Sequence, residues 1–249
     1  GITKTFGGVK ALDNVDFGLR EGEVHGLVGE NGAGKSTLMK ILYGLYEADE
    51  GEVLLNGKPL EIHEPTDAIS HGIGMIHQHF TLVPTQTVLE NIIIGTRDKR
   101  KFFLDLKGAR KKVLALQDRF GLHVDPDARV WTLSIGQQQK VEILKALYRD
   151  SRVLIMDEPT SSLSIQEVQV LFKVIADLTD AGVAIVYISH RLEEIFEIAD
   201  RIAVLRDGQM VGTVARDQTD EDEVVRMMIG RDLNEYMHER AAVKQDATV

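Results

Sequence analysis

The segment that most constrains the fold is residues 29–37, which read Gly-Glu-Asn-Gly-Ala-Gly-Lys-Ser-Thr. Its spacing fits the pattern G-x-x-x-x-G-K-[ST] of a phosphate-binding loop. The apolar run 24–28 before it predicts a short buried strand, and residues 38–43 after it predict a helix that Gly44 ends. A strand, a glycine-rich loop and a helix in this order are the context in which the pattern indicates a nucleotide-binding site.

The residue types of this loop suit the chemistry of a triphosphate. Glycines let backbone N–H groups approach phosphate oxygens without a Cβ in the way, and the following helix adds the positive end of its dipole. Lys35 supplies charge for the β- and γ-phosphates, and the Ser36 hydroxyl is a ligand for Mg²⁺. The alternative is a flexible glycine turn, which the flanking strand and helix disfavour. The predicted nucleotide-binding residues here are Gly29, Glu30, Asn31, Gly32, Ala33, Gly34, Lys35, Ser36 and Thr37.

Composition narrows the classes of protein further. The 249 residues suffice for a sizeable core, and a net charge of −10 argues against a nucleic-acid-binding surface. The absence of cysteine excludes disulfides and thiolate metal sites, and it suits a cytosolic protein. No apolar run approaches the roughly 20 residues that a membrane-spanning helix needs. The chain begins with Gly1 rather than Met, so we expect a fragment of a longer chain or a processed product.

The order of strands and helices predicts an α/β fold. Apolar runs at 73–77, 152–156, 184–188 and 202–205 alternate with helical patterns, which favours a mainly parallel, doubly wound sheet. Segments 2–6 and 11–19 around Gly7-Gly8, and residues 53–58 around Asn56-Gly57, predict antiparallel hairpins, the second with a type I′ turn. Residues 86–150 are helical and poor in strands. We therefore expect one nucleotide-binding domain over 1–235, with this helical subdomain inserted, and a linker-like tail over 236–249.

Two adjacent acids follow the apolar residues 153–156. A carboxylate at the end of a buried strand, downstream of a phosphate-binding loop, is the arrangement that holds Mg²⁺, which assigns Asp157 as a metal ligand. Glu158 would then polarise the attacking water as a general base. The alternative is that both acids only cap the turn at Pro159.

The segment 133–139, Leu-Ser-Ile-Gly-Gln-Gln-Gln, resembles the LSGGQ signature of the ATP-binding-cassette (ABC) ATPases, with Ile135 in place of a glycine. The resemblance implies that Ser134, Gly136 and Gln137 contact the γ-phosphate of a nucleotide held by a partner domain. Taken alone, the segment would be an ordinary helix start with a serine cap.

Further motifs of this family occur in the same order along the chain. By resemblance, Phe6 stacks on adenine, Gln78 senses the metal and the water and faces a transmembrane partner, and His190 contacts the γ-phosphate. Residues 161–164 occupy the D-loop, where Ser164 replaces the usual aspartate. The resemblance implies a RecA-like P-loop NTPase fold with an antiparallel β subdomain, and an ATPase whose catalytic residues are Glu158, His190 and Gln78.

A finer resemblance is to the first ATPase half of bacterial sugar and nucleoside importers, which carry two ATPase domains in one chain. It rests on residues 77–80, 133–147 and 187–191, and His79-Phe80 favours a nucleoside. It implies ATP and Mg²⁺ as cofactors, with a second ATPase domain, a transmembrane permease and indirectly a solute-binding protein as partners. The chain is expected at the cytoplasmic face of the membrane. Nucleic acid is not expected as a partner.

Two other functions compete with the importer. One is a soluble ABC-type ATPase that acts on nucleic acid or the ribosome, which the acidic charge disfavours. The other is a regulatory half that binds nucleotide without hydrolysis, which Glu158 and His190 disfavour. Trp131, just before the signature segment, is interpreted as a packing anchor.

Overall fold

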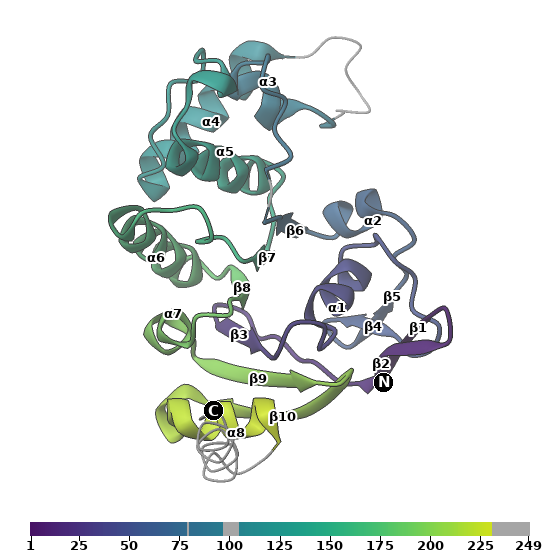
Figure 1. The fold of residues 1–249 in the computed structure, drawn as a ribbon. Coiled ribbons are helices and arrows are strands. Elements are labelled where there is room, and N and C mark those ends of the chain that lie inside the picture. Colours follow the sequence, from purple (N-terminus) through teal and green to yellow (C-terminus); the bar gives the residue numbers. More distant parts are fainter. Residues whose placement is uncertain (79, 97–104, 231–249) are drawn as a thin grey trace, which may run out of the picture.

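The computed structural model describes residues 1–78, 80–96 and 105–230. Its central sheet has six strands: β3 (Val24–Val28), β6 (Ile73–Ile76), β7 (Val153–Asp157), β8 (Ala184–Ile188), β9 (Arg201–Arg206) and β10 (Gln209–Ala215). Their order across the sheet is β10-β9-β3-β8-β7-β6 (Figure 1). β10 is antiparallel to β9, and the other pairs are parallel, which confirms the predicted mainly parallel sheet.

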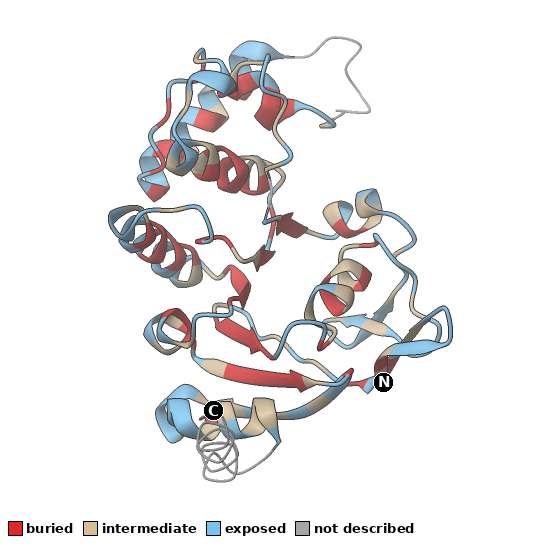
Figure 2. Cartoon of the chain, viewed as in Figure 1, coloured by how far each residue is buried: buried red, intermediate tan, exposed pale blue. Residues whose placement is uncertain are grey.

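Helices cover both faces of this sheet. Successive residues of a strand point to opposite sides, so each strand contributes side chains to the core on both faces. In β8, Val186 and Ile188 pack in one core cluster with Met39 of α1 (Lys35–Leu42), which α2 (Pro65–Ser70) also joins. Ile185 and Tyr187 pack in a second cluster with α6 (Ile165–Asp180), α7 (Leu192–Ile198) and α8 (Glu221–Ile229). The parallel strands are buried nearly throughout (Figure 2), which explains why they read as continuous apolar runs.

Two small antiparallel sheets flank α1. One pairs β1 (Ile2–Phe6) with β2 (Val9–Val15), and the other pairs β4 (Val53–Leu55) with β5 (Lys58–Leu60). Asn56 and Gly57 have φ of 53° and 74°, the positive values that the predicted type I′ turn requires. The predicted extent of the second strand, 11–19, was wrong. β2 ends at Val15 because Val15 pairs with Ile2, the first residue of β1.

A helical region lies between β6 and β7 and contains α3 (Val88–Ile93), α4 (Leu106–Phe120), a 3₁₀ turn (Val130–Thr132) and α5 (Ile135–Tyr148). Thr87 and Ser134 cap α3 and α5 through reciprocal capping boxes, as their positions predict. The described residues of 86–150 form no strand of a sheet. The tail expected at 236–249 lies outside the described residues, and the division into domains stays a prediction.

Candidate nucleotide-binding and catalytic site

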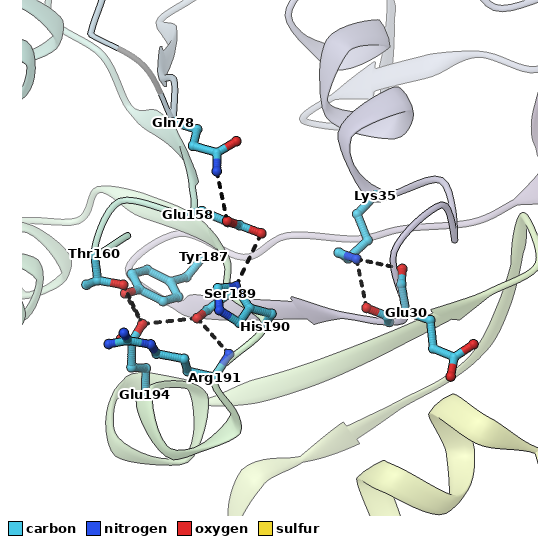
Figure 3. Close-up of polar contacts among 11 residues, drawn as sticks. Glu30, Lys35, Gln78, Glu158, Thr160, Tyr187, Ser189, His190, Arg191 and Glu194 are labelled. Atoms are coloured by element: carbon cyan, nitrogen blue, oxygen red, sulfur yellow. Dashed lines mark hydrogen bonds and ion pairs between the residues drawn. The ribbon is translucent and has the colours of Figure 1, made fainter. Parts of the chain in front are cut away.

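Lys35 is the first residue of α1, and its ammonium group lies within the loop that joins β3 to α1. Its Nζ donates hydrogen bonds to the backbone oxygens of Gly29 (2.7 Å) and Glu30 (3.0 Å), as Figure 3 shows. Burial lowers the pKa of Lys35, while the charges of Glu158 and Asp157 oppose that effect. The lysine is therefore held inside the loop, within electrostatic reach of both acids. The helix begins at Lys35 rather than at residue 38.

Gly34 and Gly32 show two different reasons for glycine in this loop. Gly34 has φ of 107°, and a Cβ there would lie 2.6 Å from the Ala11 backbone oxygen and 2.8 Å from Leu12 Cδ2. Gly32 has φ of 86°, but a Cβ there would meet nothing within 4 Å. At position 32, glycine is required only by the left-handed backbone conformation. At position 34, it is required both by that conformation and by the close approach of the backbone to β2. The loop is thus seated on the β1–β2 hairpin.

Asp157 and Glu158 stand where β7 ends. Burial, and then the neighbouring Glu158 charge, raise the pKa of Asp157 above its ordinary value. Glu158 has φ of 49°, in the left-handed region that non-glycine residues rarely adopt. Its backbone N–H donates to Ile188 of β8 at 2.9 Å, which fixes this conformation. Such backbone strain is typical of functional sites, where it sets the direction of one side chain.

The Glu158 carboxylate contacts two of the predicted site residues directly. Gln78 Nε2 donates to Glu158 Oε2 at 3.1 Å, and His190 Nδ1 lies 3.4 Å from Glu158 Oε1 (Figure 3). These three residues are far apart in the sequence. They meet because Gln78 follows β6, Glu158 follows β7 and His190 follows β8, which are neighbouring parallel strands. The carboxyl ends of such strands form the usual ligand-binding edge of an α/β sheet.

The donors at this edge fit a magnesium ion. Ser36 offers a hydroxyl, Gln78 an amide oxygen and Asp157 a carboxylate, and all three are hard oxygen donors of the kind that Mg²⁺ prefers. No group of three or more His, Cys, Asp or Glu side chains that could hold a metal occurs among residues 1–78, 80–96 and 105–230. The ion would therefore depend on phosphate oxygens and water for its remaining ligands, which is usual for Mg²⁺ at nucleotide sites.

Phe6 lies at the end of β1, on the hairpin whose other strand contacts Gly34. Its ring is 43% exposed and makes an edge contact with Tyr46, with ring centroids 5.3 Å apart. Lys4 and Lys40 lie over the Phe6 and Tyr46 rings at 5.5 and 5.4 Å. The sequence reasoning missed Tyr46, because its place beside Phe6 depends on how α1 packs against the hairpin. Two accessible rings beside a phosphate-binding loop suit a purine base.

The signature residues are not part of this cluster. Ser134 Oγ accepts a hydrogen bond from the Gln137 backbone N–H (3.3 Å), and Gln137 Oε1 accepts one from the Ser134 N–H (3.0 Å). Across the described chain, no hydrogen bond or ion pair joins residues 134–137 to residues 29–37. Gly136 instead packs against Glu167 of α6. Within one chain the start of α5 is therefore a capped helix end that belongs to the helical region.

Trp131 corrects one interpretation from the sequence. It is 66% exposed, so it is not a packing anchor. With Phe80, Ile135 and Gln78 it lines a groove of about 470 Å³ between the helical region and the sheet edge. Leu82, Pro84 and Val130 extend the apolar lining. Gln138 and Ser162 are polar members of the lining. An accessible, mainly apolar groove of this kind commonly marks a binding surface for another protein.

The sheet, the phosphate-binding loop and the acids at its edge define a P-loop nucleotide-binding domain. The family model described as "ABC transporter" matches residues 12–161. The chain therefore belongs to the ABC transporter family, as the signature segment led us to expect. The dimeric structure of a post-hydrolysis state of the ATP-binding cassette MJ0796, bound to ADP and Pi, superposes with a TM-score of 0.73 at 26% identity. That match covers 86% of this chain and 95% of the other.

Two relatives indicate a narrower group. The chain is 51% identical over 243 residues to the ribose import ATP-binding protein RbsA of Chromobacterium violaceum, across 97% of this chain and 48% of that protein. It is 46% identical over 260 residues to the glucose import ATP-binding protein TsgD13 of Haloferax volcanii, across 93% and 47%. The chain thus spans about half the length of these relatives.

Proposed function

We propose that this chain binds and hydrolyses ATP, and that the hydrolysis energises the import of a sugar. The observation that carries the ATPase is the convergence of Lys35, Asp157, Glu158, Gln78 and His190 from separate strand ends on one edge of the sheet. This edge combines a phosphate-binding loop, oxygen ligands for Mg²⁺ and a carboxylate with two polar partners. No simpler binding function needs all of these groups.

Each residue has a proposed role in the reaction. Residues 29–37 bind the phosphates, and Ser36, Gln78 and Asp157 would hold Mg²⁺, which would supply positive charge against the phosphate oxygens. Glu158 accepts a proton from water as the water oxygen attacks the γ-phosphorus, and the bond to the β-phosphate oxygen breaks to release ADP. His190, which lies beside Glu158, contacts the γ-phosphate.

The proposed site is completed by a second domain. Ser134, Gly136 and Gln137 make no polar contact with the phosphate-binding loop of their own chain within the described residues. We propose that they cover the γ-phosphate of a nucleotide on a partner ATPase domain, whose own signature residues cover this one. A lone domain then presents half a site. In it, water surrounds the negative charge that develops in the transition state, in place of the fixed hydrogen-bond donors of the partner domain.

Activity should therefore depend on assembly. We expect the ATPase activity per molecule to rise with protein concentration. Association costs several kcal/mol of translational and rotational entropy, so two half-sites meet only when the concentration is high enough to offset this cost. Adding a second ATPase domain of the importer group should raise it further, because a homodimer must use Ile135 in its own signature. Steady-state assays over a dilution series measure this. Activity that stays high and flat at the lowest measurable concentration would contradict the composite site.

Import of a sugar is supported by the relatives named for ribose and glucose import. Those names give no support to the nucleoside that His79-Phe80 suggests, and His79 itself lies outside the described residues. They also favour transport over an ATPase acting on nucleic acid or the ribosome. Copurification of the chain with nucleic acid rather than with a membrane protein would contradict this part of the proposal.

A membrane permease is the proposed partner for the groove at Trp131 and Gln78. Its apolar lining fits a segment of a permease exposed at the membrane surface, and Gln78 links that segment to Glu158. Within the described ranges, no helix has the length and apolar character needed to span a bilayer. We place the chain at the cytoplasmic face of the membrane, with a solute-binding protein as an indirect partner.

Phe6 is proposed to stack on the adenine base. Replacing Phe6 with Ala should weaken ATP binding by about 5- to 150-fold, because stacking of a base on an aromatic ring contributes about 1–3 kcal/mol. Binding of inorganic triphosphate, which has no base, should stay unchanged. Val9→Ala is the matched control, since Val9 pairs with Phe6 in the same hairpin and is 70% exposed. Equal losses for ATP and triphosphate, measured by competition titration, would remove Phe6 from the site.

A further inference from the structure

One buried carboxylate lies beneath the catalytic edge and has no role in the function proposed above. Glu194 stands in the first turn of α7 and is only 6% exposed. Its Oε2 accepts hydrogen bonds from the hydroxyl groups of Thr160 (2.8 Å), Tyr187 (2.9 Å) and Ser189 (3.0 Å). Its Oε1 accepts one from Arg191 Nη1 at 3.2 Å (Figure 3). A buried carboxylate needs this many donors to offset its desolvation.

Three of the four donors come from the two turns that carry the catalytic pair, and the fourth, Tyr187, lies in β8. Thr160 lies two residues after Glu158, in the turn that follows β7, and its side chain is buried. Ser189 directly precedes His190, and its Oγ also accepts a hydrogen bond from the Arg191 backbone N–H at 3.0 Å. The residues on both sides of His190 are therefore tied to one carboxylate. The same carboxylate holds the turn of Glu158.

Glu194 accepts all four of these hydrogen bonds. Burial, and then the Glu194 charge, raise the pKa of Tyr187, so its hydroxyl stays protonated and donates. Thr160 and Ser189 are likewise buried and aimed at the same oxygen. A buried carboxylate shared by donors from both turns holds them in place relative to each other, because a movement of either turn breaks the hydrogen bond that its own donor makes.

We propose that Glu194 is a positioning residue for ATP hydrolysis, which ties the turn after Glu158 to the turn that carries His190. It touches neither Glu158 nor His190 itself, and it acts through Thr160 and Ser189. The separation of 3.4 Å between His190 Nδ1 and Glu158 Oε1 depends on this joint. The inference rests on the proposed function, because it assigns Glu194 a part in the reaction of that site.

Glu193 supplies a matched control. It lies beside Glu194 in the same turn of α7, but it is exposed, and within the described part of the chain it makes no hydrogen bond or ion pair. Glu193→Gln removes the same charge from the same turn without touching the network. It should therefore leave both nucleotide affinity and hydrolysis unchanged.

The test compares binding with hydrolysis in Glu194→Gln, Glu193→Gln and the unaltered chain, at a protein concentration that gives full activity. We expect the Kd for a fluorescent ATP analogue to stay within about twofold, because the phosphate-binding loop lies on β3 and α1. The single-turnover rate should fall by about 10- to 100-fold, since a misplacement of about 1 Å has effects of this size. Glu193→Gln should match the unaltered chain.

Two outcomes of this comparison would overturn the proposal. A Glu194→Gln variant that keeps at least half of the single-turnover rate would show that the joint does not position the pair. Losses of affinity and rate by the same factor, with a lower melting temperature, would show that Glu194 only stabilises the fold.

Smaller changes keep the proposal testable if Glu194→Gln does not fold. Ser189→Ala and Thr160→Val each remove one donor and leave the carboxylate with its other partners. Each should lower the rate without changing Kd, and Ser189→Ala combined with Thr160→Val should lose less than the product of the two single effects, because both act through Glu194. Unchanged rates in both single variants, or fully multiplicative losses in the double variant, would overturn the proposal.

The proposed ATPase function can fail separately from this inference. If the unaltered chain hydrolyses no ATP at any concentration, either alone or with a second ATPase domain of the importer group, the function itself is wrong. If the unaltered chain is active, Glu158→Gln is inactive and Glu194→Gln is fully active, then only the positioning role of Glu194 fails.

Discussion

Replacing Lys35 with Ala is expected to weaken MgATP binding by about 100-fold or more. Hydrogen bonds to charged groups contribute about 1.5–3 kcal/mol each, and Lys35 is placed to make them to the β- and γ-phosphates. Every 1.4 kcal/mol changes the Kd about tenfold, so the loss of two such bonds gives an effect of this size. Equilibrium titration with a fluorescent ATP analogue measures the change.

The controls for this variant must show that the weaker binding comes neither from the general loss of one positive charge nor from unfolding of the phosphate-binding loop. Lys58→Ala removes an exposed cation from the β4–β5 hairpin and should leave the Kd unchanged. Lys35→Ala also removes two hydrogen bonds to loop carbonyls, so thermal unfolding of the variant should be measured alongside. A folded Lys35→Ala variant with near-unchanged affinity would mean that residues 29–37 are not the nucleotide site.

Replacing Glu158 with Gln is expected to preserve ATP binding and to lower turnover by about 100- to 10,000-fold. The amide has nearly the shape of the carboxylate, and its oxygen still accepts the hydrogen bond from Gln78. It cannot take a proton from the attacking water, and general-base catalysis contributes a factor of this order. It also removes the charge that faces His190 at 3.4 Å. Single-turnover hydrolysis, measured at saturating MgATP, isolates the chemical step from product release.

Glu193→Gln serves again as the control for a neutralised acid that lies outside the catalytic edge. It should hydrolyse ATP at the rate of the unaltered chain. A Glu158→Gln variant that retains at least half of the single-turnover rate would rule out Glu158 as the general base. The proton would then have to pass to another group or to the phosphate itself.

Structural features that depend only on residues close together in the chain, such as turns, helix starts and buried strands, could be predicted from the sequence. The type I′ turn follows from Asn56-Gly57, because each residue must adopt positive φ. The starts of α3 and α5 follow from Thr87 and Ser134, whose side chains bond to backbone three residues ahead. The buried strands follow from continuous apolar runs, because a parallel strand is covered on both faces. The family followed from the order of motifs along the chain.

The tertiary structure alone decided which of these elements meet. Strand order brings Gln78 and His190 to Glu158, and pairing with β1 ends β2 at Val15 rather than at residue 19. Nothing local to Trp131 or Glu194 indicates that the first is exposed and the second is buried under four donors. These properties depend on contacts between segments far apart in the chain. The sequence therefore determined the parts of the site, and packing of the sheet determined how they act together.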